Sequence, residues 1–254
     1  MRNKILCTLL IFSCAFHAQA VGQRTLSDST KTSQDLKFKY SSLIIPTVLI
    51  GYGFAGLEST RIKTYNLEVK EEINERIHGR MTIDDFSLFI PVLSVYGLNA
   101  MGLKGRNNFK RRTIILATSS LLMGSTGLRI KSISNIKRPD GSTNNSFPSG
   151  HTAIAFMGAE FLWQEYKNVS VWIGVAGYLV ATGTGYLRIY NDRHWLTDVA
   201  AGAGIGIIST KIAYWINPLV MNKLFHDNTG QQTNINAFPY YNGKQAGFSL
   251  SLTF

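Results

Sequence analysis

Apolar segments without charged residues alternate along this chain with short polar segments. Four of them contain no Asp, Glu, Lys or Arg: Ser41–Leu57, Ser87–Leu103, Thr113–Leu128 and Val169–Leu187. Two more carry a single charge each: Thr152–Gln164 and Val199–Ile216. Their lengths approach the ~20 residues that cross a bilayer, and their many small residues are typical of closely packed membrane helices. We therefore expect an all-α fold, a membrane-embedded bundle of about six helices.

The polar segments between them indicate a topology. The segment Lys104–Arg112 holds five basic residues and no acidic one, which is typical of a cytoplasmic loop. The next apolar segment would carry the chain to the outer side, where Lys131–His151 would lie. Two further crossings would return Arg188–Asp198 to that same side. The two polar clusters are therefore expected to meet on the external face.

Residues 1–20 have the pattern of a signal peptide, with a basic start, an apolar run and Ala18-Gln19-Ala20 at the end. An uncleaved anchor helix is the alternative. Cleavage would leave the mature chain outside, and two full crossings before Lys104 would return it outside, against the basic loop. One early segment should therefore not cross, and we expect this of Ser41–Leu57, which contains Pro46 and three glycines.

We divide the chain into four parts. They are the signal peptide (1–20), a polar segment (21–40), a helical domain (41–225, with its motif core at 131–198) and a tail (226–254). The polar stretch Glu58–Asp85 has the period of an amphipathic helix. In the tail, apolar and polar residues alternate from Phe248 to Phe254, and Asn242-Gly243 favours a tight turn. A short C-terminal β-hairpin is therefore expected.

Composition narrows the class of partner. The formal net charge is +11, from 26 Lys and Arg against 15 Asp and Glu, which suits nucleic acid, an anionic membrane or a phosphorylated substrate. The basic residues form no continuous stripe, so a nucleic-acid partner is not expected. The mean hydropathy of +0.03 leaves a soluble bundle with buried helices as an alternative.

The only cysteines, Cys7 and Cys14, lie in the signal segment, so no disulfide or cysteine metal site is expected. Nothing in the sequence indicates an oligomeric state.

The first polar cluster has the groups that an oxyanion needs. Lys131 and Arg138 are cations at neutral pH, and Arg188 from the second cluster would join them. Ser149 offers a hydroxyl, and Gly150 lets a ligand approach the backbone closely. Both residues lie where an apolar helix begins, and the free N–H groups of a helix N-terminus favour an anion. Phosphate fits this combination best.

The second cluster has the pattern of an activated nucleophile. His194 and Asp198 are four residues apart and would share one face of a helix. The carboxylate could then accept a hydrogen bond from one ring nitrogen and leave the other unprotonated. Asp198 favours the charged imidazole and the nearby cations disfavour it, so a neutral His194 requires the cations to prevail. His151 would serve as the general acid.

These residues resemble the three-part motif of the type 2 phosphatidic acid phosphatase family, which shares its fold with vanadium haloperoxidases. The first part is "KSISNIKRP" (131–139), the second "PSGH" (148–151) and the third "LRIYNDRHWLTD" (187–198). The spacing matches throughout, and the one departure is Leu187 where the family usually has serine. The resemblance covers about residues 85 to 217.

The resemblance implies an acid phosphatase/haloperoxidase-like core and a role for each matched residue. His194 would form a phosphohistidine, Asp198 would orient it, and His151 would protonate the departing alkoxide. The phosphate would be held by Lys131, Arg138, Ser149, Gly150 and Arg188. No metal ion and no cofactor are implied, because these cations supply the positive charge.

We therefore expect a metal-independent phosphatase that hydrolyses a phosphomonoester or pyrophosphate on a membrane lipid, at the periplasmic face of the inner membrane of a bacterial envelope. The substrate's headgroup cannot be read from the motif. Three alternatives remain at this point: a soluble periplasmic acid phosphatase, a vanadate-dependent haloperoxidase and a non-catalytic membrane scaffold.

Overall fold

The computed structural model describes residues 40–74, 81–225, 234–241 and 246–253. The signal peptide expected at 1–20, with its two cysteines, and all of the polar segment 21–40 except its last residue lie outside the described residues. The expectations for them stay predictions.

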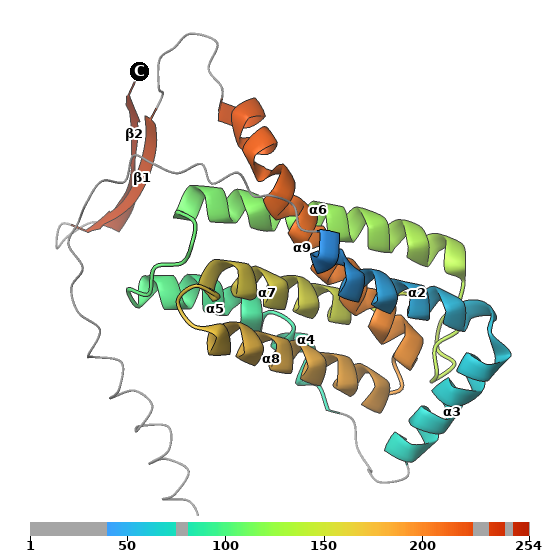
Figure 1. The fold of residues 1–254 in the computed structure, drawn as a ribbon. Helices are drawn as coiled ribbons and strands as arrows, with labels where there is room; N and C mark the ends of the chain where they lie inside the picture. The colour runs from blue at the N-terminus through green and yellow to red at the C-terminus, as the bar shows by residue number, and fades with distance from the viewer. Residues whose placement is uncertain (1–39, 75–80, 226–233, 242–245, 254) are drawn as a thin grey trace, which may run out of the picture. The chain divides into compact units, whose positions relative to one another are not determined.

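Each of the six apolar segments forms a helix (Figure 1). In chain order they are α2 (Ile44–Glu58), α5 (Ile90–Ala100), α6 (Phe109–Ser134), α7 (Gly150–Tyr166), α8 (Val171–Tyr190) and α9 (Leu196–Phe225). Local chemistry sets their ends. Asn108 caps α6 by accepting a hydrogen bond from the Arg111 N–H at 2.9 Å, and α6 ends where Asn135 adopts the left-handed conformation, with φ at 47°.

Two more helices bring the number of α-helices among the described residues to eight, rather than about six. Helix α3 (Thr60–Asn74) is the amphipathic helix expected within Glu58–Asp85. Helix α4 (Asp84–Ser87) is a single turn that the pattern did not predict. It begins with two aspartates, which the partial positive charge of a helix N-terminus favours.

Helix lengths bear on the expectation for the first two apolar segments. A 3₁₀ turn, η2 (Tyr40–Leu43), continues into α2, and Tyr40–Glu58 is one of three described helices long and apolar enough to cross a membrane, with α6 and α9. Helix α5 has 11 residues and is about 16 Å long, against a hydrocarbon core of about 30 Å. By length and composition, Ser41–Leu57 rather than Ser87–Leu103 is the better candidate for a crossing, which is the opposite of the expectation.

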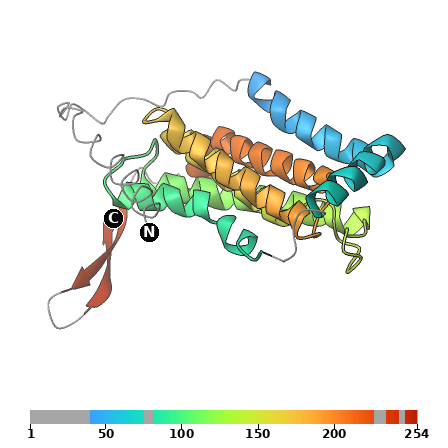
Figure 2. The same cartoon turned by 90° about the horizontal axis from the view of Figure 1, so that it is seen from below.

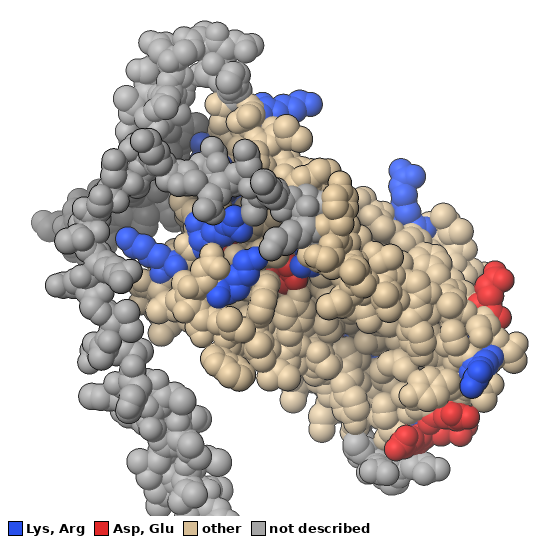
Figure 3. Space-filling view, in the orientation of Figure 1, with Lys and Arg blue, Asp and Glu red and all other residues tan. Residues whose placement is uncertain are grey.

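The distribution of charge on the surface is that of a helical bundle whose middle faces apolar surroundings. In Figure 3 the charged side chains of the visible face lie mostly toward the two ends of the helices, and most of the surface between them is uncharged. Large apolar side chains are exposed on the helices, including Val48 on α2, Leu121 on α6 and Leu179 on α8.

Helix α7 lies at the centre of the bundle and packs against α5, α8 and α9 (Figure 2). Small residues bring α7 and α9 close together, because a Cβ atom at Gly202 or Gly206 would overlap the carbonyl oxygens of Ser149 and Ala153. Seven buried residues of α5, α6, α7 and α9 form the main apolar cluster: Val95, Ile115, Phe161, Leu162, Tyr166, Ala213 and Tyr214.

The two charges that interrupt the later apolar segments neutralise each other. Lys211 of α9 lies 2.7 Å from the carboxylate of Glu160 on α7, which also accepts a hydrogen bond from Tyr178 of α8. Because an unpaired charge inside a bundle is costly, this contact explains how both residues fit among apolar helices.

Beyond α9, β1 (Asn234–Tyr241) and β2 (Ala246–Thr253) pair antiparallel, with Asn234 opposite Thr253 and Tyr241 opposite Ala246. They correspond to the hairpin expected in the tail. The Asn242-Gly243 turn lies outside the described residues.

The close contact of α7 and α9 predicts an asymmetry between two glycines. Gly206→Val should destabilise the protein by about 1–3 kcal/mol, because the new side chain overpacks the interface. Gly183→Val should change the stability little, since Gly183 is exposed on α8 and a Cβ there meets no atom within 4 Å. Thermal unfolding in detergent measures both, and equal midpoints for the two variants would contradict the packing described here.

Candidate active site

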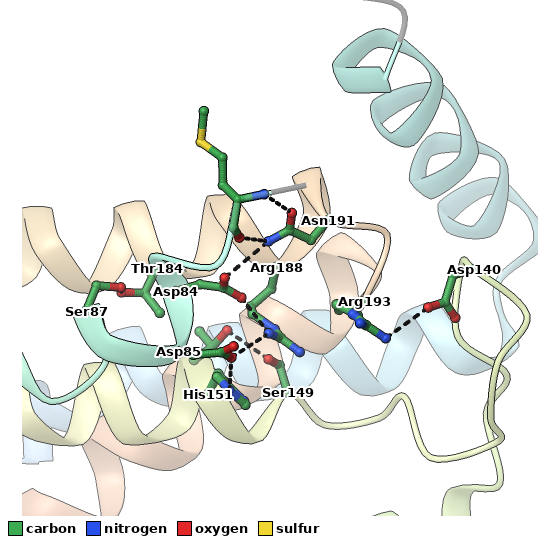
Figure 4. A network of polar contacts seen from close by, with 12 residues as sticks. Asp84, Asp85, Ser87, Asp140, Ser149, His151, Thr184, Arg188, Asn191 and Arg193 are labelled. Atoms are coloured by element: carbon green, nitrogen blue, oxygen red, sulfur yellow. Dashed lines mark hydrogen bonds and ion pairs between the residues drawn. The ribbon is translucent and has the colours of Figure 1, made fainter. Parts of the chain in front are cut away.

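The ends of three helices bring the two polar clusters together. The N-terminus of α7, the C-terminus of α8 and the N-terminus of α9 lie at one end of the bundle, beside the loop after α6 (Figure 4). The Ser149 N–H donates to the carbonyl of Asp198 at 3.0 Å, and the His194 N–H donates to the carbonyl of Arg188 at 3.2 Å. The meeting of the clusters, predicted from the order of the apolar segments, is therefore observed.

His194 reaches Asp198 by a route that differs from the one expected. It lies in the loop between α8 and α9, not on a helix. Its Nδ1 is 3.6 Å from Oδ2 of Asp198, longer than a hydrogen bond, and this Nδ1 has no hydrogen-bond partner among the described residues. The carboxylate is held instead by Ser146 Oγ at 2.5 Å and by the Trp195 N–H at 2.9 Å.

Burial controls the charge of His194. The side chain is 2% exposed, and this burial lowers the pKa of His194 to about 4. Asp198 acts in the opposite direction, while Arg188 and Lys131 lower the pKa further. The ring is therefore neutral at pH 7. Sequence reasoning expected the cations to decide this balance and missed burial, which is the larger cause.

The start of α7 presents backbone and side-chain groups to the same region. Ser149 precedes the helix and is fully buried, and its hydroxyl is hydrogen-bonded to Thr152 Oγ1 at 2.9 Å. A hydroxyl can donate one hydrogen bond and accept others, so Ser149 Oγ can still form a hydrogen bond with a ligand. Gly150 is the first residue of α7, and a Cβ there would meet no atom within 4 Å. The space beside the helix N-terminus is open at that point.

Arg188 is held by a carboxylate that sequence reasoning missed. Its Nη1 donates to Asp84 Oδ2 at 2.5 Å, and Asp84 also accepts a hydrogen bond from Asn191 at 3.2 Å (Figure 4). Asp84 is 2% exposed. The Nε of Arg188 is buried and has no partner among the described residues. The guanidinium is thus fixed from one side by α4 and keeps an unused donor.

The next residue of α4, Asp85, contacts the second motif histidine, His151. Asp85 Oδ1 lies 3.0 Å from His151 Nε2 and 3.7 Å from Arg188 Nη1 (Figure 4). The signal in the sequence was a pair of acidic residues directly before an apolar segment. It was easily overlooked, because the contact spans 66 residues.

Lys131 and Arg138 complete the group of cations. Arg138 lies in the loop after α6, where its Nε donates to Asn145 at 2.9 Å. Burial and the nearby Arg188 guanidinium lower the pKa of Arg138. Lys131, in the last turn of α6, interacts electrostatically with Arg138, Asp198 and Arg188. Like charges this close repel each other, so an anion with several oxygens would stabilise the cluster.

Several known proteins are similar to this chain. The sequence model of the PAP2 superfamily matches residues 110–221. The chain is 32% identical over 243 residues to a lipid A 1-phosphatase of Porphyromonas gingivalis, a match that covers 89% of this chain and 52% of that protein. It is 36% identical over 75 residues to the bacitracin transport permease protein BcrC of Bacillus licheniformis, covering 30% and 35%. In the crystal structure of Aquifex aeolicus LpxE, 28% identical, the match covers 59% of this chain and 94% of that one, with a TM-score of 0.46.

The segment that carries all three parts of the motif, residues 110–221, therefore belongs to the PAP2 superfamily. The resemblance predicted from the motif is confirmed at this level. The chain spans about half the length of the lipid A 1-phosphatase that it matches and about a third of the length of BcrC.

The burial of His194 makes a prediction that NMR can test without any substrate. With labelled histidine, His194 should remain neutral down to about pH 5 and titrate near 4, and Asp198→Asn should lower its pKa further because a favourable negative charge is lost. The urea-unfolded chain should show histidine pKa values near the usual ~6.5. A His194 that titrates near 6.5 in the folded protein would contradict the burial described.

Proposed function

We propose that this protein is a metal-independent phosphatase that removes phosphate from a phosphomonoester or pyrophosphate on a membrane lipid through a phosphohistidine. One observation carries the proposal: a buried, neutral imidazole, His194, faces the Asp198 carboxylate with its Nδ1 and lies within the field of two motif cations, Lys131 and Arg188. We place the ring proton on Nδ1, which faces the Asp198 carboxylate, so that Nε2 is the nucleophilic atom.

The first half of the reaction transfers the phosphoryl group to the enzyme. Nε2 of His194 attacks phosphorus, and the bond from phosphorus to the leaving oxygen breaks. His151 gives its proton to that oxygen, so the alcohol departs neutral. Asp198 stabilises the positive charge that develops on the His194 ring, as the carboxylate does in other triads.

The second half returns the enzyme to its starting state. His151, now neutral, takes a proton from a water molecule as that water attacks the phosphohistidine. The bond between phosphorus and Nε2 breaks, and inorganic phosphate leaves. In both halves the cations of Lys131, Arg138 and Arg188 offset the charge on the phosphoryl oxygens, and the N–H groups at the start of α7 add to them.

One observation of the structure supports a lipid as the substrate: three described helices are long and apolar enough to span a bilayer. The similarity to a protein named lipid A 1-phosphatase agrees with a phosphate carried on a lipid. We place the site on the periplasmic side of the inner membrane, because the basic loop at Lys104–Arg112 favours the cytoplasm.

Substitutions in the site should reduce activity to different extents, according to whether the residue is the nucleophile, its orienting group or a phosphate ligand. Phosphate release from lipid phosphomonoesters should be lost in His194→Ala. It should fall about a thousandfold in Asp198→Asn, which cannot stabilise the charged ring, and about a hundredfold or more in Arg138→Ala, which removes a charge from the phosphoryl group.

Lys223→Ala is the control for these variants, since Lys223 lies in the last turn of α9, far along the helix from Asp198. It should retain full activity. Unchanged phosphate release in His194→Ala would contradict the catalytic assignment and favour a non-catalytic scaffold.

The membrane assignment has its own test. After alkaline carbonate extraction of cell membranes, the protein should remain in the pellet, because apolar helices that span the bilayer are not released by high pH. Recovery of the protein in the supernatant would favour the soluble acid phosphatase instead.

A further inference from the structure

We propose that Asp85 selects the leaving group: it favours a lipid phosphomonoester whose leaving group is neutral and carries hydroxyl or amide hydrogen-bond donors, and it disfavours a lipid pyrophosphate, whose leaving group is an anion. This inference rests on the proposed function and specifies its substrate class. It makes Asp85 a specificity-determining residue beside the general acid.

The two adjacent aspartates of α4 have different surroundings. Asp84 is 2% exposed and is engaged by Arg188 and Asn191. Asp85 has a side chain that is 56% exposed, although one of its oxygens lies 3.0 Å from His151 Nε2. Asp84 therefore holds the Arg188 guanidinium inside the protein, whereas the exposed Asp85 points toward His151 and Arg188 (Figure 4).

The position of Asp85 places it next to the leaving oxygen. In the proposed reaction His151 gives its proton to that oxygen, so the oxygen must lie against the imidazole. The atom or group that the oxygen joins then lies close to the Asp85 carboxylate. Hydroxyl or amide groups there can donate to a carboxylate, whereas a second phosphate would meet a like charge.

The cations do not cancel this effect on the leaving-group side. In the described part of the chain, Arg188 is the cation that acts on His151. Its Nη1 lies 2.5 Å from Asp84 and 3.7 Å from Asp85, so two carboxylates share one guanidinium and a net negative charge is left. Lys131 interacts instead with Arg138, Asp198 and Arg188, on the side of the nucleophile. The positive charge is therefore concentrated around the transferred phosphoryl group.

The apolar residues around Asp85 indicate that the leaving group also carries hydrocarbon. Ile83 is 61%, Phe86 75% and Phe89 50% exposed, and they stand on either side of Asp85 in the sequence. Exposed clusters of large apolar side chains mark surfaces that contact a partner or a membrane. A leaving group that combines polar donors with an acyl or prenyl chain fits both features.

Three substrates separate charge from hydrogen bonding while the protein is kept in detergent. Farnesyl phosphate and farnesyl pyrophosphate share a chain and differ in the charge of the leaving group, and N-octanoyl-glucosamine 1-phosphate adds hydroxyl and amide donors. The wild type should have its highest kcat/KM for the sugar phosphate and its lowest for the pyrophosphate.

Asp85→Asn keeps the shape and removes the charge. It should raise the ratio of kcat/KM for farnesyl pyrophosphate over farnesyl phosphate by about tenfold, the size expected for one partly screened charge pair. Asp85→Ala should in addition lose the preference for the sugar phosphate over farnesyl phosphate. Glu71→Gln, an exposed acid of α3, is the matched control and should leave both ratios unchanged.

Other outcomes would overturn the inference. An unchanged ratio in Asp85→Asn, an equal loss on all three substrates, or a wild type that prefers the pyrophosphate would each show that Asp85 does not select the leaving group. Failure of the proposed function would look different, because the wild type would then release phosphate from none of the three.

Discussion

The carboxyl group and the carbonyl of Asp198 hold the two polar clusters in one site. The fully buried carboxylate accepts hydrogen bonds from Ser146, in the loop before α7, and from the Trp195 N–H, while the carbonyl accepts one from the Ser149 N–H. A buried charge is costly unless such partners compensate it. The same residue thus joins the start of α7 to the start of α9 and stands behind the Nδ1 of His194.

Around Asp198, the charged residues of the site lie in separate places according to the role proposed for each. Asp84 fixes Arg188 from inside the protein, Asp85 contacts His151 at the edge, and the two other motif cations, Lys131 and Arg138, lie toward the nucleophile. Such an arrangement concentrates positive charge where a phosphoryl group would sit and leaves the departing group near a carboxylate. Transition-state stabilisation and leaving-group selection would then come from different carboxylates of the same short helix.

The sequence predicted the features that repeat or that are spaced along one segment. The apolar segments form helices, because a charge-free run in apolar surroundings must pair its backbone N–H and C=O groups within a helix. The motif residues meet at one end of the bundle, because antiparallel neighbouring helices return the chain to the same side. It missed what depends on distant contacts. Asp84 and Asp85 lie far along the chain from Arg188 and His151, the His194–Asp198 contact comes from a loop rather than a helix, and the short α5 cannot be distinguished from a span by composition alone.

Rapid quenching of the purified protein with a radiolabelled lipid phosphomonoester tests the central claim most directly, since the buried His194 ring is proposed to carry the phosphoryl group between the two half-reactions. The account predicts a labelled protein whose phosphate is lost in acid and kept in alkali, as expected for phosphohistidine, and whose label maps to the peptide that contains His194. A label on Ser149, or phosphate release with no labelled protein at any quench time, would contradict it.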